Sequence, residues 1–209
     1  MNAIPASEPE LMMTEAEYLA FEDTAETKHE FVDGHVYDWP GYDYDVERLA
    51  GATRTHNLLQ GNLVAALVPA AQSAGCQAYG SDMRLRVRLQ HRGRETRRYY
   101  YPDAMVLCDQ ELREEEGDDE MHVTRPCVIV EILSRGSVRL DRTEKLEIYQ
   151  SIPSVQACLI VHQRQRRIER HWRNPDSAWQ LEVISSGSVP IPCIGVDLAL
   201  EAIYANVAR

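Results

Sequence analysis

Two hydrophobic periodicities alternate along the chain and predict a mixture of helices and strands. Between residues 56 and 74, apolar side chains recur every three or four positions, as on one face of an amphipathic helix. Between residues 82 and 89, Met, Leu and Val alternate with Asp and Arg, the two-residue repeat of a half-buried strand with a basic outer face. Residues 127–133 are apolar except for Glu131, which indicates a central strand covered on both faces.

Local signals define the ends of several elements. Thr14 and Glu17 form a capping box, which predicts a short helix over residues 15–21. Asp33-Gly34 suits the positive φ angles of a type I′ turn and predicts a hairpin between strands 29–32 and 35–39. For the helix at 56–74, Thr55 is the expected cap, Gly75 the stop, and Pro69 a kink or an early end. Further predicted elements are strands at 97–101, 104–108, 155–161, 167–172 and 179–184, a helix at 142–150 capped by Asp141, and a closing helix at 198–207 capped by Asp197.

Composition places limits on the class of protein. The chain has 209 residues, 44% of them hydrophobic, which is enough for one core, and we expect a single domain over 1–209. The net charge of −11 argues against a generic nucleic-acid coat or a polybasic membrane binder. Neither a secretory leader nor a membrane-length apolar run is evident, so we expect a cytoplasmic protein that does not enter the membrane. Residues 1–13 are expected to be flexible, and residues 109–124 to form an acidic loop.

The five cysteines are widely spaced and lie mostly in apolar runs. This placement favours small core residues over disulfides or a zinc site, and no CxxC or HExxH motif occurs.

Two carboxylates and a lysine stand where solvation would not place them. Asp103 follows a proline at the start of a buried strand, Glu131 interrupts the most apolar strand, and Lys145 lies on the next helix. Two unpaired buried carboxylates on adjacent strands would be costly, and a shared divalent cation would offset that cost. Because the ligands are all oxygens, the expected cation is Mg²⁺ or Mn²⁺.

Each residue also has an ordinary structural interpretation. A Pro-Asp pair is common in turns, and a glutamate in an apolar strand can belong to a salt bridge. Lys145 could pair with Asp141 one helical turn away. Only the combination of the three residues favours a site.

The order of several short motifs resembles one known family. These motifs are Glu30-Phe31-Val32-Asp33-Gly34, Arg54-Thr55-His56-Asn57, Tyr101-Pro102-Asp103, Val130-Glu131-Ile132-Leu133-Ser134, and Asp141-Arg142-Thr143-Glu144-Lys145 before Tyr149. Together they resemble the Uma-type restriction endonuclease family of the PD-(D/E)XK nuclease superfamily, and the resemblance covers nearly the whole chain. It implies an α+β fold with a restriction-endonuclease-like central mixed β-sheet flanked by helices and carrying extra β-hairpins.

The resemblance also implies roles for individual residues. Asp103 and Glu131 would hold the metal, with the backbone carbonyl of Ile132 as a third ligand. Glu30 would orient a water on the metal or bind the metal directly. The superfamily lysine is expected at Leu133, where this chain departs from the pattern, and Lys145 would replace it.

Substrate contacts are less sharply indicated. His56 could bind phosphate or make a structural hydrogen bond at the helix start. Seven basic residues fall between Arg84 and Arg98 and five between Arg164 and Arg173, so a basic face for DNA is expected in spite of the acidic total. Arg84 and Arg86 are the candidate DNA contacts, and ordinary solvated strand faces are the alternative.

The sequence therefore predicts a Mg²⁺-dependent endonuclease that hydrolyses phosphodiester bonds of DNA. A homodimer is a further expectation, since cutting both strands of a duplex commonly uses two sites. The alternative is a catalytically inactive nuclease fold that serves as a nucleic-acid-binding or assembly module. A nucleophile-triad hydrolase is disfavoured because the chain has no Gly-x-Ser-x-Gly turn.

Overall fold

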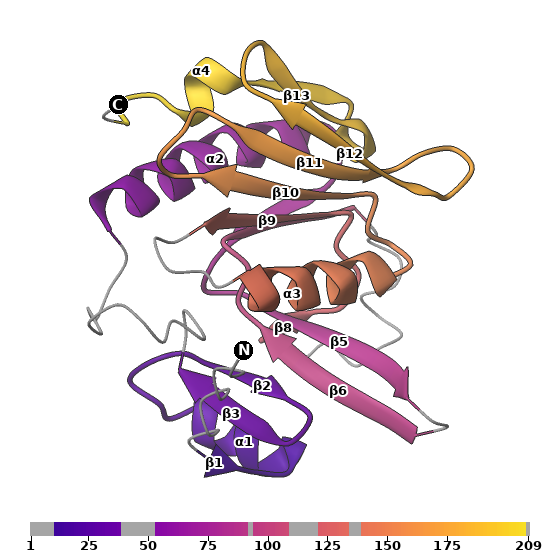
Figure 1. Cartoon of the computed structure of the whole chain (residues 1–209). Coiled ribbons are helices and arrows are strands. Elements are labelled where there is room, and N and C mark those ends of the chain that lie inside the picture. Colours follow the sequence, from indigo (N-terminus) through magenta and orange to yellow (C-terminus); the bar gives the residue numbers. More distant parts are fainter. Residues whose placement is uncertain (1–10, 39–52, 92–93, 109–120, 134–138, 208–209) are drawn as a thin grey trace, which may run out of the picture.

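Two layers of strands organise the part of the chain that the computed structural model describes, which comprises residues 11–38, 53–91, 94–108, 121–133 and 139–207. Within these ranges the strands form two six-stranded sheets and one two-stranded sheet. One six-stranded sheet occupies the upper half of the molecule in Figure 1 and the other the lower half. The mixture of helices and sheets agrees with the expected α+β class.

The upper sheet, called the central sheet below, is mixed. Its strands are β12 (Trp179–Ile184), β11 (Ile168–Arg173), β10 (Ala157–His162), β9 (Val128–Leu133), β7 (Ala104–Leu107) and β4 (Gln77–Gly80), in that spatial order. Strand β9 runs parallel to β10 and antiparallel to β7. It therefore lies inside the sheet, as its nearly continuous apolar sequence predicts.

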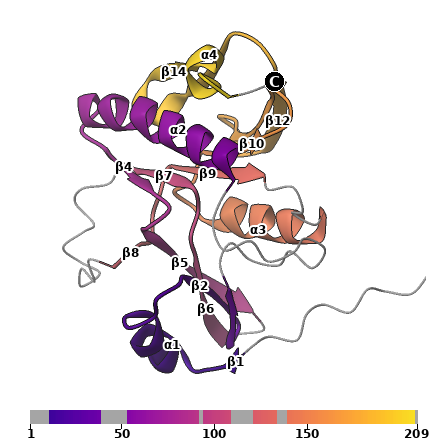
Figure 2. The same cartoon turned by 90° about the vertical axis from the view of Figure 1, so that its left-hand side faces the viewer.

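One long helix covers each face of the central sheet. The helices α2 (Arg54–Ser73) and α3 (Arg139–Ser151) lie on opposite sides of it in Figure 2. Because side chains alternate along β9, Val130 packs into the core beneath α2, whereas Ile129 packs into the core that includes Tyr149 of α3. Glu131 lies two residues after Ile129, so its side chain projects from the same face of β9, toward α3.

The lower sheet, called the N-terminal sheet below, carries the first helix. Phe31 from this sheet stacks on Tyr18 of that helix with ring centroids 4.9 Å apart, and both lie in a small core with Tyr99. The elements are α1 (Glu15–Glu22) and the strands β1 (Leu11–Met12), β3 (His35–Asp38), β2 (His29–Val32), β6 (Arg94–Tyr100), β5 (Arg84–His91) and β8 (His122–Val123), the strands being given in spatial order.

The C-terminal segment differs from the predicted closing helix at 198–207. It consists of β13 (Ser188–Ile191), the 3₁₀ helix η2 (Pro192–Ile194), β14 (Val196–Ala199) and α4 (Leu200–Ile203). The prediction is wrong because β14 pairs with β13, which places Leu198 opposite Val189 and buries both. Asp197 therefore lies in a strand and caps no helix.

Two predicted helix starts also move. Thr53, not Thr55, caps α2: its Oγ1 accepts a hydrogen bond from the His56 N–H at 3.1 Å. Asp141 lies inside α3, which begins at Arg139. In contrast, the Thr14 capping box is present.

Pro69 does not end α2, which continues to Ser73. An interior proline costs a helix about 3 kcal/mol. Here Leu67 and Ala71 are fully buried in the core on the central sheet, and this packing outweighs the local cost. The predicted stop at Gly75 is confirmed by its φ of +72° just after the helix.

Some predictions fall partly outside the described residues. Residues 1–10 and 109–120 are not described, but β1 lies within the predicted flexible segment 1–13, and β8 lies within the predicted loop 109–124. In the described ranges, none of the helices combines the length and the apolar character needed to span a bilayer.

The cysteines correct the sequence analysis most clearly. Cys76 is bonded to Cys108 and Cys127 to Cys193, whereas Cys158 is a free, buried thiol. The expectation of isolated core cysteines holds for Cys158 and is wrong for the other four. The pairs form between residues far apart in sequence, so their spacing gave no sign of them.

Candidate active site

The register of the central sheet places the two predicted metal ligands side by side. In the antiparallel ladder between β7 and β9, Ala104 lies opposite Val130. One residue further, at the end of β7 where the chain enters the sheet, Asp103 comes opposite Glu131. Residues 28 positions apart in sequence thus meet where the start of β7 lies beside the middle of β9.

Asp103 is held by the backbone of the strand that carries Glu131. The Ile132 N–H donates to Asp103 Oδ2 at 2.6 Å, and only 3% of Asp103 is exposed. The other oxygen, Oδ1, lies 3.0 Å from His56 Nε2. This pair is not aligned as a hydrogen bond, and no other described residue donates to Oδ1, so this buried oxygen faces the site without a hydrogen bond.

Glu30 and Lys145 form a buried ion pair across two layers of the fold. Glu30 lies on β2 and is fully buried, and Lys145 Nζ donates to its Oε1 at 2.7 Å. The Tyr101 N–H donates to the same oxygen at 3.4 Å. Glu30 Oε2 is buried and receives no hydrogen bond from the described residues. The ammonium of Lys145 also lies 5.6 Å from the centroid of the Tyr100 ring.

Glu131 connects these groups electrostatically. Its Oε1 accepts a hydrogen bond from the Tyr149 hydroxyl at 2.6 Å. Although part of the side chain reaches solvent, protein atoms surround the carboxyl group, and this burial raises its pKa to about 8. The charge of Lys145 opposes that rise, whereas the charges of Asp103 and Glu30 add to it.

These donors fit a hard divalent cation. Asp103 Oδ1 and Glu30 Oε2 are buried carboxylate oxygens without hydrogen bonds from described residues, and such oxygens are the ligands that Mg²⁺ and Mn²⁺ prefer. Glu30, Asp103 and Glu131 do not bring three oxygens within 4.8 Å of one another. The arrangement therefore suits an ion held by Asp103 and one of the two glutamates and completed by backbone oxygen and water, as is usual for Mg²⁺.

The predicted substrate contacts occupy different surroundings. His56 lies beside Asp103 at the start of α2. Arg84 is only 2% exposed, and its guanidinium donates to the Met121 carbonyl and lies 3.6 Å from Asp23. This burial places Arg84 within the N-terminal sheet and away from a polymeric substrate. Arg86 is half-buried on the same strand. Burial raises the pKa of Tyr99, and the positive charge of Arg86 opposes part of that rise.

Tyr149 is a site residue to which the sequence analysis gave no role. It lies four residues after Lys145, so both side chains project from the same face of α3 toward the carboxylates. Its own pKa is raised, chiefly by burial and then by the charge of Glu131. The spacing of Lys145 and Tyr149 was the signal in the sequence that could have revealed this role.

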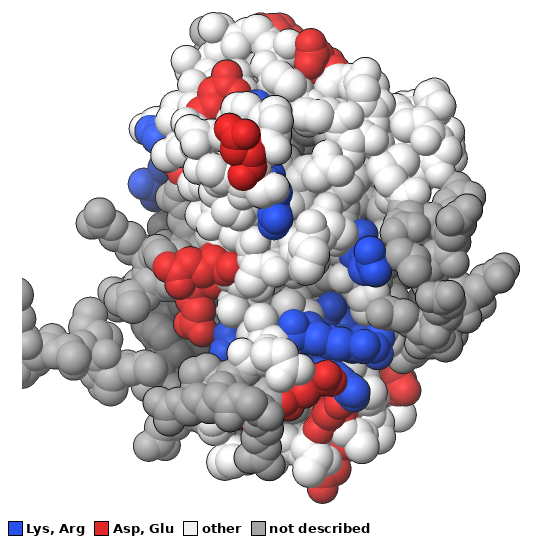
Figure 3. Space-filling model, turned by 90° about the vertical axis from the view of Figure 1, so that its right-hand side faces the viewer, with Lys and Arg blue, Asp and Glu red and all other residues white. Residues whose placement is uncertain are grey.

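Acidic side chains form ion pairs with several of the arginines that were expected to make a basic face. On the face shown in Figure 3, Lys and Arg gather in a short band across the lower half, with Asp and Glu close by. Several arginines of the two basic segments form ion pairs, namely Arg97 with Glu15 and Glu95, Arg98 with Asp33 and Glu144, Arg166 with Glu201, Arg167 with Glu169, and Arg170 with Glu182. These pairs reduce the positive potential that the sequence alone suggests.

Comparison with known proteins supplies the family. Residues 15–202 match the family Uma2, described as "Putative restriction endonuclease". The chain belongs to the Uma2 family. Two uncharacterized proteins of Synechocystis sp. are similar to this Uma2 chain. One, sll1609, is 31% identical over 170 residues, which cover 81% of this chain and 86% of the relative, and the other, slr1290, is 26% identical over the full length of both.

A solved structure resembles this Uma2 fold as a whole. The crystal structure of a protein from Anabaena variabilis, described as a "putative nuclease belonging to DUF820", matches with a TM-score of 0.64, over 91% of this chain and 96% of that chain. The two sequences are only 13% identical, so the likeness concerns the fold. The family and the fold thus confirm the resemblance stated from the motifs.

Proposed function

We propose that this protein is an endonuclease that uses Mg²⁺ or Mn²⁺ to hydrolyse phosphodiester bonds of DNA. One observation carries the proposal: Glu30, Asp103, Glu131 and Lys145 converge from four separate segments into one buried cluster. Burying three carboxylates beside one ammonium opposes folding, and groups with perturbed charges of this kind concentrate at catalytic sites. The family description agrees with this chemistry.

Asp103 and Glu131 would hold the cation, with the Ile132 carbonyl as a third ligand. A bound cation would supply Lewis acidity, polarising the phosphate and lowering the pKa of a water. The Ile132 N–H fixes Asp103, and the Tyr149 hydroxyl fixes Glu131, so neither carboxylate has to reorganise when substrate binds.

Lys145 and Glu30 would act on the phosphate and the attacking water. The ammonium of Lys145 would stabilise negative charge on the phosphoryl oxygens as the phosphorus becomes pentacovalent. Glu30 holds that ammonium in place through Oε1, while its Oε2, to which none of the described residues donates, can accept a hydrogen bond from water. His56, whose Nε2 lies 3.0 Å from Asp103 Oδ1, would contact the substrate phosphate.

The test is cleavage of supercoiled plasmid by the purified protein with Mg²⁺, with Mn²⁺ and with chelator. We expect nicked and linear DNA only with metal, and a loss of at least about 100-fold in Asp103→Asn and Glu131→Gln, which keep the shapes of the side chains. Glu147→Gln is the matched control, because it removes an exposed carboxylate from α3 near Lys145 and should retain activity. Equal cleavage by all variants would reject the assignment.

Calorimetric titration with Mn²⁺ separates metal binding from cleavage. Saturable binding in the wild type and in Glu147→Gln, but not in Asp103→Asn, is the expected result. If the folded wild type binds DNA but neither metal nor cleavage is detected, the inactive binding-module alternative replaces this proposal.

A further inference from the structure

Four of the five cysteines come together at the end of the central sheet that is farther from the carboxylates. They come from four segments: Cys76 precedes β4, Cys108 follows β7, Cys127 precedes β9, and Cys193 lies in η2. Besides the two bonded pairs, Cys108 Sγ lies 3.5 Å from Cys127 Sγ. The sulfurs of Cys108, Cys127 and Cys193 all lie within 4.8 Å of one another.

The strand register explains this convergence. Gln77 lies opposite Leu107 between β4 and β7, so Cys76 and Cys108 face each other just beyond the ladder. The Cys127 N–H donates to the Val106 carbonyl at 2.7 Å, which sets Cys127 beside the end of β7. Three neighbouring strands, β4, β7 and β9, thus bring one cysteine each to the same end of the sheet.

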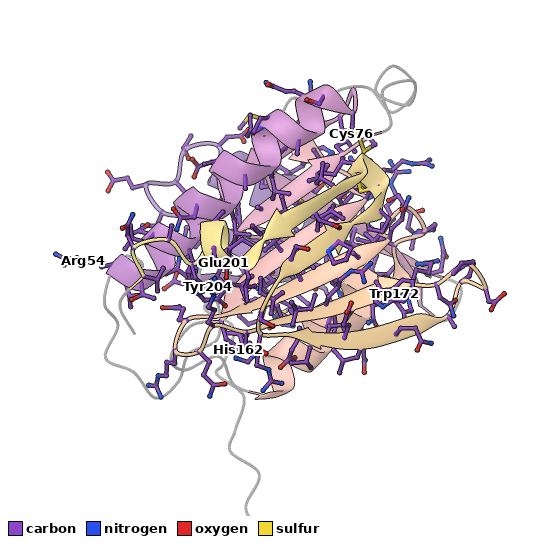
Figure 4. All side chains as sticks on the ribbon, turned by 90° about the horizontal axis from the view of Figure 1, so that it is seen from above. Arg54, Cys76, His162, Trp172, Glu201 and Tyr204 are labelled. Carbon is purple, nitrogen blue, oxygen red and sulfur yellow. A yellow bond between two sulfur atoms is a disulfide. The ribbon has the colours of Figure 1, made fainter. Side chains whose placement is uncertain are left out.

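Cys193 completes the group from above the sheet. Cys108 Sγ lies 3.6 Å from the Cys193 carbonyl oxygen, so η2 rests directly on this end of the sheet. Figure 4 shows Cys76 at the end of α2 opposite Arg54, beside the C-terminal strands drawn in yellow. Because Asp103 and Cys108 are at opposite ends of β7, roughly 15 Å of strand separates this cluster from the candidate active site.

We propose that, in the reduced protein, these four cysteines bind one Zn²⁺ as a tetrathiolate site. With zinc–sulfur bonds of about 2.3 Å, the sulfurs of a tetrahedral site lie about 3.8 Å apart. The 3.5 Å between the sulfurs of Cys108 and Cys127 already has this size, and the sulfur of Cys193 lies within 4.8 Å of both. Cys76 reaches the group through its bond to Cys108, and reduction would let the bonded partners move apart to bind the ion. Two independent disulfides need no contact with each other, whereas here the sulfur of Cys108 from one pair lies within 4.8 Å of both sulfurs of the other pair.

The chemistry of loading the site balances as follows. A dithiol or phosphine reductant delivers two electrons to each disulfide, and two protons give two thiols per pair. The four thiols then release four protons as their sulfurs bind Zn²⁺, so affinity for the ion rises with pH. The close spacing of the sulfurs favours a single zinc ion over an iron–sulfur cluster. A cluster contains several iron atoms and holds its cysteine sulfurs farther apart.

The ion would fasten the C-terminal segment to the central sheet. η2 joins β13 to β14, and Cys193 is the residue of this connection that reaches the strand ends. Zinc bound here would link the N-terminal ends of β4 and β9 and the C-terminal end of β7 to the last part of the fold. The proposed role is therefore structural and independent of the nuclease proposal.

The test begins with full-length protein purified under reductant without oxygen. Metal analysis should give one zinc per chain, and replacement by Co²⁺ should produce the thiolate charge-transfer band and the strong visible bands of tetrahedral cobalt. The double variant Cys108→Ser/Cys193→Ser should lose both signals. Cys158→Ala, which removes the free cysteine, and Asp103→Asn, which alters the other site, should keep them.

A second readout does not depend on any variant. Zinc should protect the four cysteines of the reduced wild type from alkylation, as followed by mass spectrometry of peptides, and chelator should remove the protection and lower the melting temperature. A folded, reduced wild type that binds no metal, or that binds iron in place of zinc, would overturn the proposal. So would thiolate bands that persist in the double variant.

Discussion

Glu30 and Glu131 are both glutamates on strands of the interior, but their neighbours differ. Glu30 contacts the ammonium of Lys145 at 2.7 Å, so its negative charge is paired. Glu131 receives its hydrogen bond from the neutral Tyr149 hydroxyl, and Asp103 and Glu30 add negative charge nearby. The same residue type therefore supplies a paired carboxylate in one place and a carboxyl that resists ionisation in the other.

This difference makes the stability of the metal-free protein depend on pH. The pKa of Glu131 is raised from 4.5 to about 8, so the folded carboxyl keeps its proton at pH values where the unfolded one has lost it. The protonated Glu131 carboxyl contributes fully to the free energy of unfolding below pH 4.5, and this contribution is lost as the pH rises through about 8. We expect Glu131→Gln to stabilise the metal-free protein by about 2 kcal/mol at pH 8.5 and to change little at pH 4.5.

Urea unfolding in chelator at the two pH values measures this effect. Glu147→Gln is the control, since it removes an exposed carboxylate from the same region. If Glu131→Gln and the wild type lost stability in parallel as the pH rose, Glu131 would not be the group responsible.

At the scale of elements, the start of α2 controls the position of His56. Thr53 Oγ1 accepts from the His56 N–H, and this cap begins the helix one turn before the residue that contacts Asp103. The sequence placed the cap at Thr55 because both threonines precede the apolar stripe. The backbone decides between them: Thr53 is extended, with φ of −63° and ψ of 157°, whereas Thr55 is already helical.

Removal of this cap should be measurable. We expect Thr53→Ala to lower the free energy of unfolding by about 1 kcal/mol, while Thr53→Ser keeps the oxygen and most of the stability. Thr55→Ala is the matched comparison, because a residue in the first turn contributes no cap and alanine favours a helix. Thermal unfolding of the three variants distinguishes the two threonines, and an equal loss at both positions would contradict the assigned cap.

At the scale of the whole molecule, the candidate site exists only because the two sheets meet. Glu30 comes from the N-terminal sheet, Asp103 and Glu131 from the central sheet, and Lys145 from α3 between them. A second link runs nearby through Arg98 of β6. Its guanidinium donates to Asp33 at 3.1 Å in the hairpin turn and to Glu144 at 3.3 Å on α3.

Loss of Arg98 should therefore loosen α3 against the N-terminal sheet. Because Asp33 and Glu144 are substantially exposed, solvent weakens these pairs, and we expect Arg98→Gln to cost only about 1 kcal/mol of stability. Plasmid cleavage should fall more than this loss of folded protein explains, since α3 also carries Lys145. Arg88→Gln, which removes an exposed charge from the neighbouring strand, is the control and should leave both properties near the wild-type values.

Much of the local structure is determined by the sequence itself. The Thr14 capping box and the positive φ angles of Asp33 and Gly34 depend on residues within four positions, so the pattern predicts them correctly. The apolar run at 127–133 likewise predicts a central strand, because a strand with two apolar faces is stable only when both are covered. The order of five short motifs along the chain was sufficient to indicate the family, which the match over residues 15–202 confirms.

Tertiary structure decided the features that depend on partners distant in sequence. Leu198 pairs with Val189 in a strand where its own segment predicts a helix, and Pro69 stays within α2 because the central sheet packs against it. The ion pair between Glu30 and Lys145 joins residues 115 positions apart, and the strand register brings Cys76 and Cys108 together although 32 positions separate them. Such contacts arise from burial across layers of the fold, where the energy gained in packing exceeds the local preferences that a sequence pattern records.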